Sequence, residues 1–290
     1  MGNCILAFPN RVDSTFYPVA FSGGAWAPAM PLENLKDPLL VRVARSASVE
    51  PVDTWFDIDM GAARDIRVCA IPKGTVGRKG MVRLRGANDP DFAAPLVDTG
   101  WRDWWRVIYA EGALPWEHPS AWDGKVTEED AEGYAMPFVH VLPQAVNARY
   151  WRVEIDDSAN PAGFIDLSRL FLAPGWQPSI NLSHGNGLGW EDETTREASL
   201  GGARFHDPRP RRRVARFAIE HLPLDEALAW PWEMQRLLGT HRQAFFVFDP
   251  DDTTHLHRRA FLATLRRLSP LEMAAIGRES AEFELEEVIA

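Results

Sequence analysis

Hydrophobic and polar residues alternate in short runs over the first 175 residues of the chain. This two-residue period is that of a half-buried β-strand. Clusters of Gly, Pro, Asn and Asp separate the runs and are typical of turns. Many short strands at this spacing, with few helical patterns, predict a β-sandwich or jelly roll over residues 1–175. The runs are Trp55–Met60, which we expect Gly61 to end, Ile66–Ile71, Met81–Arg85, Tyr150–Ile155 and Phe164–Leu172.

The alternation also predicts which side chains build the core of this sandwich. We expect eight of them to face inward or to pack against an inward neighbour. They are Trp55, Ile58, Ile66, Val68, Leu84, Trp151, Val153 and Leu170.

Residues 101–143 interrupt the strand pattern, and we interpret them as an insertion in a loop of the sandwich. The segment Thr127–Glu132 has the composition of one helical turn, with Thr127 as its N-cap. The Trp-rich part allows three interpretations: rings packed over one end of the sandwich, a sugar-binding surface, or a protein–protein contact. Its candidate interface or ligand residues are Trp101, Trp104, Trp105, Arg106, Trp116 and Trp122.

The rest of the chain predicts a connector and a smaller domain. Residues 176–212 are rich in Gly, Asn, Asp and Pro and are expected to link the two domains. Residues 213–290 predict a β-rich domain with one helix, in which Gly239 ends the helix and Pro231 kinks it or marks its start. Its expected elements are a strand Arg213–Glu220, the helix Asp225–Leu238, a hairpin of Phe245–Phe248 with Arg259–Leu265, and a strand Ala281–Val288.

Net charge and composition exclude some classes of binding partner. The formal net charge of −10 argues against nucleic acid or an anionic membrane as the main partner. No run is apolar for long enough to span a membrane, and no basic region followed by an apolar run indicates a secretory signal. Cys4 and Cys69, the two cysteines among the 290 residues, are expected to be buried, reduced thiols. The twelve Trp residues favour interfaces or carbohydrate-facing surfaces.

Four motifs in order resemble discoidin-type, galactose-binding-like domains. Trp55–Gly61 with Ile66–Val68 is similar to the family's W-x-x-x-D-L-G … I-x-x-V core, and Val82–Asp89 to its strand-plus-turn motif. Ala148–Val153 with Ile165–Leu170 is similar to its closing segment. The resemblance implies a jelly roll. The chain lacks the Cys pair that often ties the ends of such domains together, and it carries the Trp-rich insertion.

The second half resembles minor tail proteins of tailed phages, of the distal-tail or tail-tip type. The resemblance rests on Arg216–Ile219, the helix Asp225–Leu238, Phe245–Asp251 and Phe283–Leu285. It implies a virion protein that folds in the bacterial cytoplasm and assembles with other tail proteins and with copies of itself.

The candidate catalytic and metal-binding motifs of the chain each have a simpler structural interpretation. No Gly-x-Ser-x-Gly elbow is present, and Gly185–Gly189 lacks the lysine of a phosphate loop. His255 and His257 beside the acidic turn Asp249–Asp252 are a weak metal or Ca²⁺ candidate, and surface histidines at a hairpin turn fit better. Asp57 and Asp59 are interpreted as the polar face of a strand and not as a glycosidase pair.

The basic run Arg209–Arg213 either docks against an acidic surface, such as the chain's own Glu-rich last strand, or is simply solvated. Its members Arg211, Arg212 and Arg213 complete the candidate interface residues. The sequence therefore predicts a non-enzymatic structural component of a phage tail tip or baseplate, without cofactor or metal. The alternative is a carbohydrate-binding module that recognises a glycan on the host surface.

Overall fold

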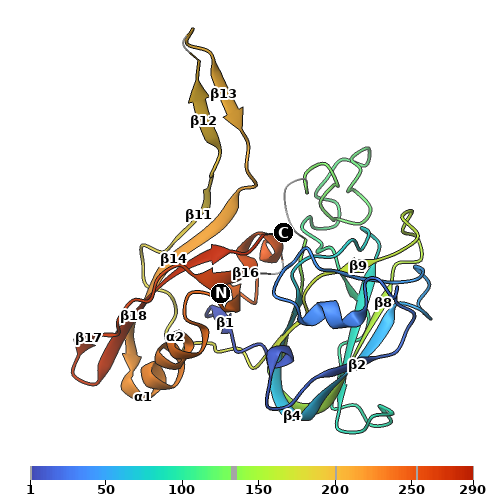
Figure 1. Cartoon of the computed structure of the whole chain (residues 1–290), viewed down its shortest axis with the longest axis horizontal. Helices are drawn as coiled ribbons and strands as arrows, with labels where there is room; N and C mark the ends of the chain where they lie inside the picture. The colour runs from blue at the N-terminus through green and yellow to red at the C-terminus, as the bar shows by residue number, and fades with distance from the viewer. Residues whose placement is uncertain (1, 132–135, 200, 253, 290) are drawn as a thin grey trace. The chain divides into compact units, whose positions relative to one another are not determined.

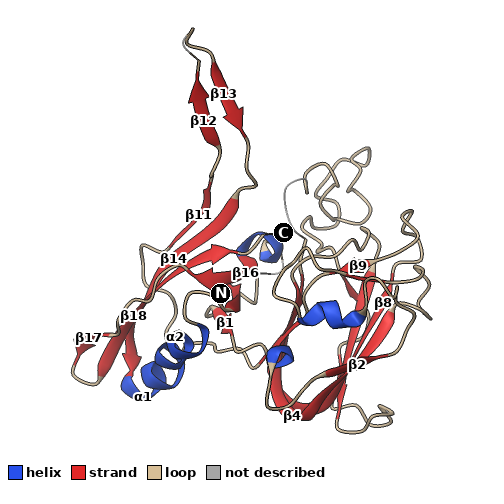
Figure 2. Ribbon diagram, viewed as in Figure 1, coloured by secondary structure: helices blue, strands red, loops and turns tan. Residues whose placement is uncertain are grey.

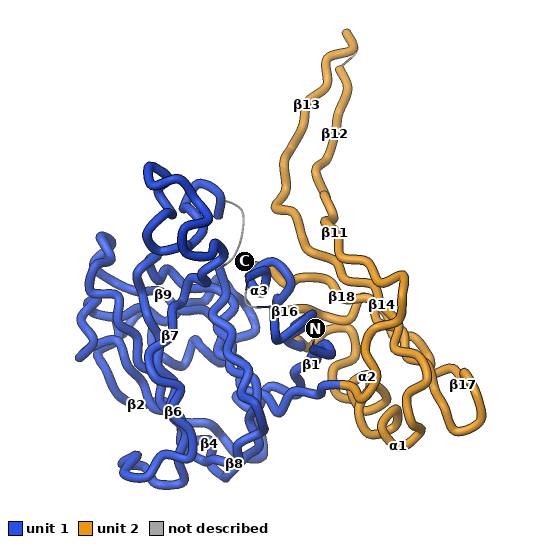
Figure 3. The backbone as a smooth tube through the Cα atoms, turned by 180° about the vertical axis from the view of Figure 1, so that it is seen from behind, with its two compact units in different colours: residues 1–177, 244–261, 290 blue, residues 178–243, 262–289 orange. Residues whose placement is uncertain are grey.

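The computed structural model describes the chain except residues 1, 132–135, 200, 253 and 290. The chain forms two compact units (Figure 3). Unit 1 contains residues 1–177 together with 244–261, and unit 2 contains residues 178–243 and 262–289. Both are built mainly of strands (Figure 2), so the expected mostly-β fold class, a jelly-roll sandwich plus a smaller β-rich part, is confirmed.

Unit 1 has one large antiparallel sheet in the order β10-β4-β8-β5-β6, with β2 also paired to β4 and β7 to β5. A separate two-stranded pair, β3–β9, belongs to the opposite layer, and β1 pairs with β15. Two 3-10 helices lie at Arg11–Asp13 and Leu32–Lys36. The strands are β1 Ile5–Ala7, β2 Ala20–Ser22, β3 Ala44–Arg45, β4 Trp55–Ile71, β5 Met81–Ala87, β6 Val97–Asp98, β7 Arg102–Asp103, β8 Phe138–Asp156, β9 Asp166–Leu167, β10 Phe171–Ala173 and β15 Gln243–Val247.

The prediction that Gly61 ends its strand is wrong, because β4 runs on for 17 residues through it. Gly61 has φ +71°, in the left-handed region that glycine enters without a steric penalty. The β4–β8 register shifts between Asp59 and Arg64 at this point, which is the signature of a bulge. Two expected runs therefore form one bent strand.

The core of unit 1 lies between the large sheet and the layer that carries β3, β9 and the 3-10 helix Leu32–Lys36. Seven of the eight predicted core residues are buried. Trp55 is the exception: Phe56, Ile58 and Met60 face the core, so the strand period places Trp55 on the outer face with Asp57. Its ring lies there against the guanidinium of Arg152. The thiols of Cys4 and Cys69 are buried and form no disulfide among the described residues, and burial raises the pKa of each to about 12.

Unit 2 contains an antiparallel sheet in the order β16-β18-β14-β11, with β17 also paired to β18. A two-stranded ribbon, β12–β13, continues away from this sheet (Figure 1). The strands are β11 Gly187–Glu191, β12 Thr195–Ala198, β13 Arg204–Asp207, β14 Arg212–Pro223, β16 Ala260–Leu265, which begins in unit 1, β17 Glu272–Ala275 and β18 Arg278–Glu287.

The helix expected over Asp225–Leu238 forms as three consecutive pieces. They are α1 Leu224–Ala227, a π-helical turn Leu228–Trp232 and α2 Glu233–Leu238. Pro231 lies inside the π turn, where the wider turn accommodates a residue that lacks an N–H donor. Gly239 ends the helix with φ +53°, as predicted.

Two segments differ from their predicted structure or their predicted domain. The stretch 176–212, expected as a connector, carries strands β11, β12 and β13 and belongs mostly to unit 2. Residues 244–261, expected in the second domain, belong to unit 1. The expectation of surface histidines is wrong for His257, which is buried in the short helix α3, Leu256–Arg259.

Candidate functional site

The Trp residues of the insertion divide into two groups with different environments. Trp104 is buried, its indole N–H donates to the Met136 carbonyl at 2.8 Å, and its ring packs near Phe138. Trp105 donates to the Val76 carbonyl at 3.0 Å. Arg106 donates to the Val139 carbonyl, and burial lowers the pKa of its guanidinium. The predicted end of the insertion at residue 143 is wrong, because β8 begins at Phe138, and contacts with Phe138 and Val139 tie Trp104 and Arg106 to this strand.

Trp116 and Trp122 are exposed instead, at 75% and 88% of their surfaces. Both line a hollow of about 420 Å³ formed by the insertion itself. Trp101 is 42% exposed and lies outside the lining. The hollow is lined by Val107, Tyr109, Ala110, Glu111, Gly112, Leu114, Trp116, Ala121, Trp122, Asp123 and Gly124.

A network of ion pairs and hydrogen bonds fixes the base of this hollow. Arg78, in the loop between β4 and β5, donates to Ser120 Oγ, Asp123 Oδ1 and the Lys125 carbonyl at 3.0, 2.6 and 3.0 Å. The Lys125 ammonium in turn donates to the Arg78 carbonyl at 2.9 Å and to Asp103 Oδ1 at 2.6 Å. The side chains of Arg78 and Lys125 therefore hold the insertion in place.

Backbone hydrogen bonds between the two ends of the lining segment complete the scaffold of the hollow. The N–H groups of Ile108 and Tyr109 both donate to the Gly124 carbonyl, at 2.8 and 2.9 Å. Gly124 has φ +63°, and a Cβ there would lie 2.5 Å from the Tyr109 carbonyl oxygen, so glycine is required. The Tyr109 ring meets His118 edge-on with centroids 6.2 Å apart. The hollow is therefore built on a defined backbone.

The lining combines aromatic faces with carboxylates. Exposed indole rings offer flat apolar surfaces with one N–H donor each. The carboxylate of Asp123 uses Oδ1 for Arg78 and for the Lys125 N–H, and within the described residues neither its Oδ2 nor the Glu111 carboxylate has a hydrogen-bond partner. Such a surface can stack against an apolar ring face and accept hydrogen bonds from hydroxyl or ammonium groups.

The helical turn predicted at Thr127 forms over the residues that the structure describes. Thr127 Oγ1 accepts from the Asp130 N–H at 3.0 Å, and the Ala131 N–H donates to the Thr127 carbonyl. Glu132, the last residue of that prediction, lies outside the described residues.

The basic run finds its partners within unit 2. Arg212 pairs with Glu286 at 2.6 Å, and buried Arg213 pairs with Glu287. Arg211 is exposed, 3.8 Å from Asp192. The acidic last strand is therefore neutralised largely by its own chain, because β14 and β18 are antiparallel neighbours. Arg212 and Arg213, which were predicted as interface residues, therefore form ion pairs within the chain.

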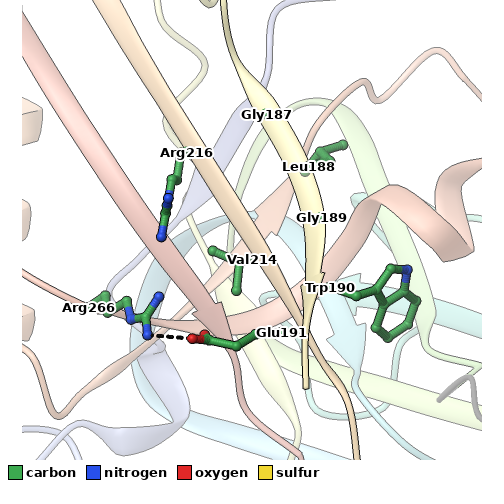
Figure 4. A pocket seen from close by; sticks show the side chains of 8 residues that line it. All are labelled: Gly187, Leu188, Gly189, Trp190, Glu191, Val214, Arg216 and Arg266. Carbon is green, nitrogen blue, oxygen red and sulfur yellow. Dashed lines mark hydrogen bonds and ion pairs between the residues drawn. The ribbon is translucent and has the colours of Figure 1, made fainter. Parts of the chain in front are cut away.

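A second hollow, of about 330 Å³, lies over the face of β11 and β14 (Figure 4). Gly187 and Gly189 leave the sheet bare there, with Val214 as the floor and Arg216 and Arg266 beside it. Arg266 donates to the Glu191 carboxylate at 2.9 Å. Sequence reasoning interpreted this glycine-rich stretch as a flexible connector.

The carboxylates of Asp249 and Asp252, predicted as a weak metal site, form hydrogen bonds and an ion pair within the chain. Asp249 Oδ1 accepts from the N–H groups of Gly2 and Asp251, and Asp252 pairs with Arg259 at 2.9 Å. Within the described part of the chain, no group of three or more His, Cys, Asp or Glu side chains is arranged to hold a metal ion. No described helix has both the length and the apolar composition needed to cross a membrane.

Comparison with known proteins finds similar folds in solved structures. One is a CBM32 module of a family 31 glycoside hydrolase from Clostridium perfringens, with 14% identity, TM-score 0.35, and coverage of 53% of this chain and 93% of that one. Another is a family 32 CBM of the same organism in complex with galactose, with 13% identity, TM-score 0.35, and coverage of 58% and 98%.

A third similar structure is a GH29 fucosidase from Ruminococcus gnavus in complex with fucose, with 11% identity and TM-score 0.38. The match covers 59% of this chain and 28% of that enzyme. No protein-family model matches the chain, and no curated protein matches it. At these identities and TM-scores, the similarities carry nothing about what this chain binds.

Proposed function

We propose that the chain binds a carbohydrate in the hollow of its Trp-rich insertion. The observation that supports this most is the exposure of Trp116 and Trp122 along one hollow of about 420 Å³. Leaving two large rings in water is unfavourable by the hydrophobic effect, and a ligand with an apolar ring face would cover them. The volume lies within the range usual for small-ligand sites.

The charges of the lining favour a class of sugar. The described lining contains the carboxylates of Glu111 and Asp123 and no Arg or Lys side chain. Like charges placed together are unfavourable, so acidic sugars are disfavoured. Neutral or amino sugars supply hydroxyl or ammonium donors that both carboxylates can accept.

A glycan array that contains neutral, amino and acidic sugars tests this proposal, with calorimetry on the best binder. Trp122→Ala and Trp116→Ala should each weaken binding about tenfold or more, which corresponds to about 1.4 kcal/mol. Trp101→Ala is the matched control, because that ring is half-exposed but lies outside the hollow. A full-length protein that binds no glycan, or an equal effect of Trp101→Ala, would contradict the proposal.

Assembly into a phage tail tip or baseplate is the second candidate function, and with it a place in the virion. It rests on the resemblance of the second half to tail proteins, and one structural feature favours it. All eight strand residues of the β12–β13 ribbon are exposed. A two-stranded ribbon with no core of its own is marginally stable in water, so a partner that covers it would stabilise it. Mass spectrometry of purified phage particles should detect the chain, and its absence from particles would exclude this role.

A further inference from the structure

The sheet of unit 2 has two strands with an open edge. β11 pairs with β14, and β17 pairs with β18. Within the described residues, neither strand pairs with another strand on its far side. Because β14 and β17 lie on opposite sides of β18, the two open edges face opposite ways along the sheet. Open edges present backbone N–H and C=O groups that can bind a further strand.

The two faces of β11 differ in character (Figure 4). The β11–β14 register places Gly187, Gly189 and Glu191 on the face of Val214 and Arg216, and Leu188 and Trp190 on the other face. A Cβ at either glycine would meet nothing within 4 Å, and neither has a left-handed φ. One face of β11 is therefore open and charged, with Arg216 paired to Glu284 and Arg266 paired to Glu191, and the other face is apolar.

β17 likewise has a charged face and an apolar face. Glu272 lies opposite Ser280 and therefore on the same face as Glu284, which pairs with Arg216. Met273 lies opposite Glu279, on the other face, and is 75% exposed. Glu272 of β17 thus lies on the charged face of the sheet. The exposed side chain of Met273 lies on the apolar face, the face of Leu188.

The chain directions are compatible as well. β11 is antiparallel to β14, β14 is antiparallel to β18, and β17 is also antiparallel to β18. β11 and β17 therefore run in opposite directions. A second copy placed as a continuation of the same sheet would bring its β17 alongside β11 as an antiparallel neighbour, with the two faces in matching orientation.

We propose that β17 of one copy adds to the open edge of β11 of a second copy. Glu272 then lies on the side of Arg216, whose side chain is 67% exposed, and Met273 lies on the side of Leu188. This contact joins two different surfaces, so it repeats from copy to copy and builds a ring or a filament. The inference rests on the assembly candidate and does not depend on glycan binding.

The test measures the mass of the full chain by sedimentation across a range of concentrations. The wild-type protein should form species well above the 32.6 kDa of one chain. Gly189→Glu places a carboxylate where Glu272 of the second copy would lie, and Met273→Glu places one against the apolar Leu188, so each variant opposes the contact at one edge and should be monomeric alone. Val52→Glu, at an exposed apolar side chain of unit 1, is the matched control and should assemble like the wild type.

A mixture of the two blocked variants gives the sharpest outcome. The Gly189→Glu chain keeps an intact β17 and the Met273→Glu chain keeps an intact β11, so together they should form a 1:1 dimer and stop there. Assembly of either variant alone at wild-type levels would overturn the β11–β17 contact while leaving assembly itself in place. A wild-type chain that stays monomeric throughout would overturn both.

Discussion

Arg152 lies directly opposite Asp57 in the β4–β8 ladder and donates two hydrogen bonds to its carboxylate, at 2.5 and 2.6 Å. The same guanidinium lies against two rings, Trp55 at 4.6 Å and Phe92 at 4.7 Å from their centroids. Arg149 makes a similar two-bond contact to Asp59. The paired aspartates are therefore ion-pair partners on the outer face of the sheet, as the sequence predicted when it assigned them to a polar strand face.

The first prediction concerns this contact. Asp57→Ala should lower the free energy of unfolding by about 1 kcal/mol, because a two-bond ion pair about a fifth exposed is stronger than an exposed one. Arg152→Ala should cost more, about 2 kcal/mol, because both cation–π contacts are lost as well. Urea unfolding of the single and double variants measures the coupling. Equal costs for both single variants would show that the rings contribute nothing.

The second prediction contrasts two tryptophans of unit 1. Trp151→Ala should lower the free energy of unfolding by about 3–5 kcal/mol, because its side chain is fully buried in the core. Trp122→Ala should leave stability nearly unchanged, because that ring is 88% exposed. Thermal unfolding compares the two. An unchanged melting temperature for Trp151→Ala would mean that β8 packs differently from the structure.

The third prediction uses two glycines in strands. A Cβ at Gly86 would lie 2.9 Å from both the Trp151 ring and Val97, so Gly86→Ala should destabilise unit 1 by about 1–3 kcal/mol. Gly187→Ala is the control, because its Cβ meets open space and alanine loses less backbone entropy on folding. Chemical denaturation of both variants should give opposite or clearly unequal shifts, and a neutral Gly86→Ala would contradict the packing.

The fourth prediction concerns pH. Burial, followed by the charges of Arg106 and Arg102, lowers the pKa of His140 from 6.5 to about 4. Between these values the unfolded chain binds a proton that the folded chain does not, so stability falls as pH decreases from 6.5 towards 4. His140→Gln should reduce this slope. NMR titration of the imidazole checks the pKa directly, and titration near 6.5 would contradict the assignment.

The sequence predicted the strands where alternation was uninterrupted, as in Tyr150–Ile155, because one face of each strand is buried and the pattern records it. It erred at Trp55, since hydrophobicity alone does not reveal that an indole on the outer face packs on Arg152. Gly61 was misjudged for a related reason: a left-handed glycine can end a strand or bend it, and the partner strand β8 decides which.

The candidate site was predictable in composition and not in geometry. The insertion was recognised from its Trp content, but Trp104 and Trp122 are the same residue type in the same segment. Their different burial depends on distant partners, such as the Met136 carbonyl for Trp104. Arg78, which fixes the base of the hollow, lies 45 positions from Asp123, and nothing in its local sequence marks it as an anchor.

The pairing of β1 with β15 has a consequence for how the protein is made. Ile5 lies opposite Val247 and Ala7 opposite Phe245, so β1 cannot form its ladder until the much later strand β15 has been made. Until residue 247 has emerged, Ile5–Ala7 lacks its partner strand, and the bridge between Leu6 and Trp176 is the earlier backbone pairing of this apolar stretch. Nascent chains halted before that point should expose this segment to chaperones, and those halted after it should not.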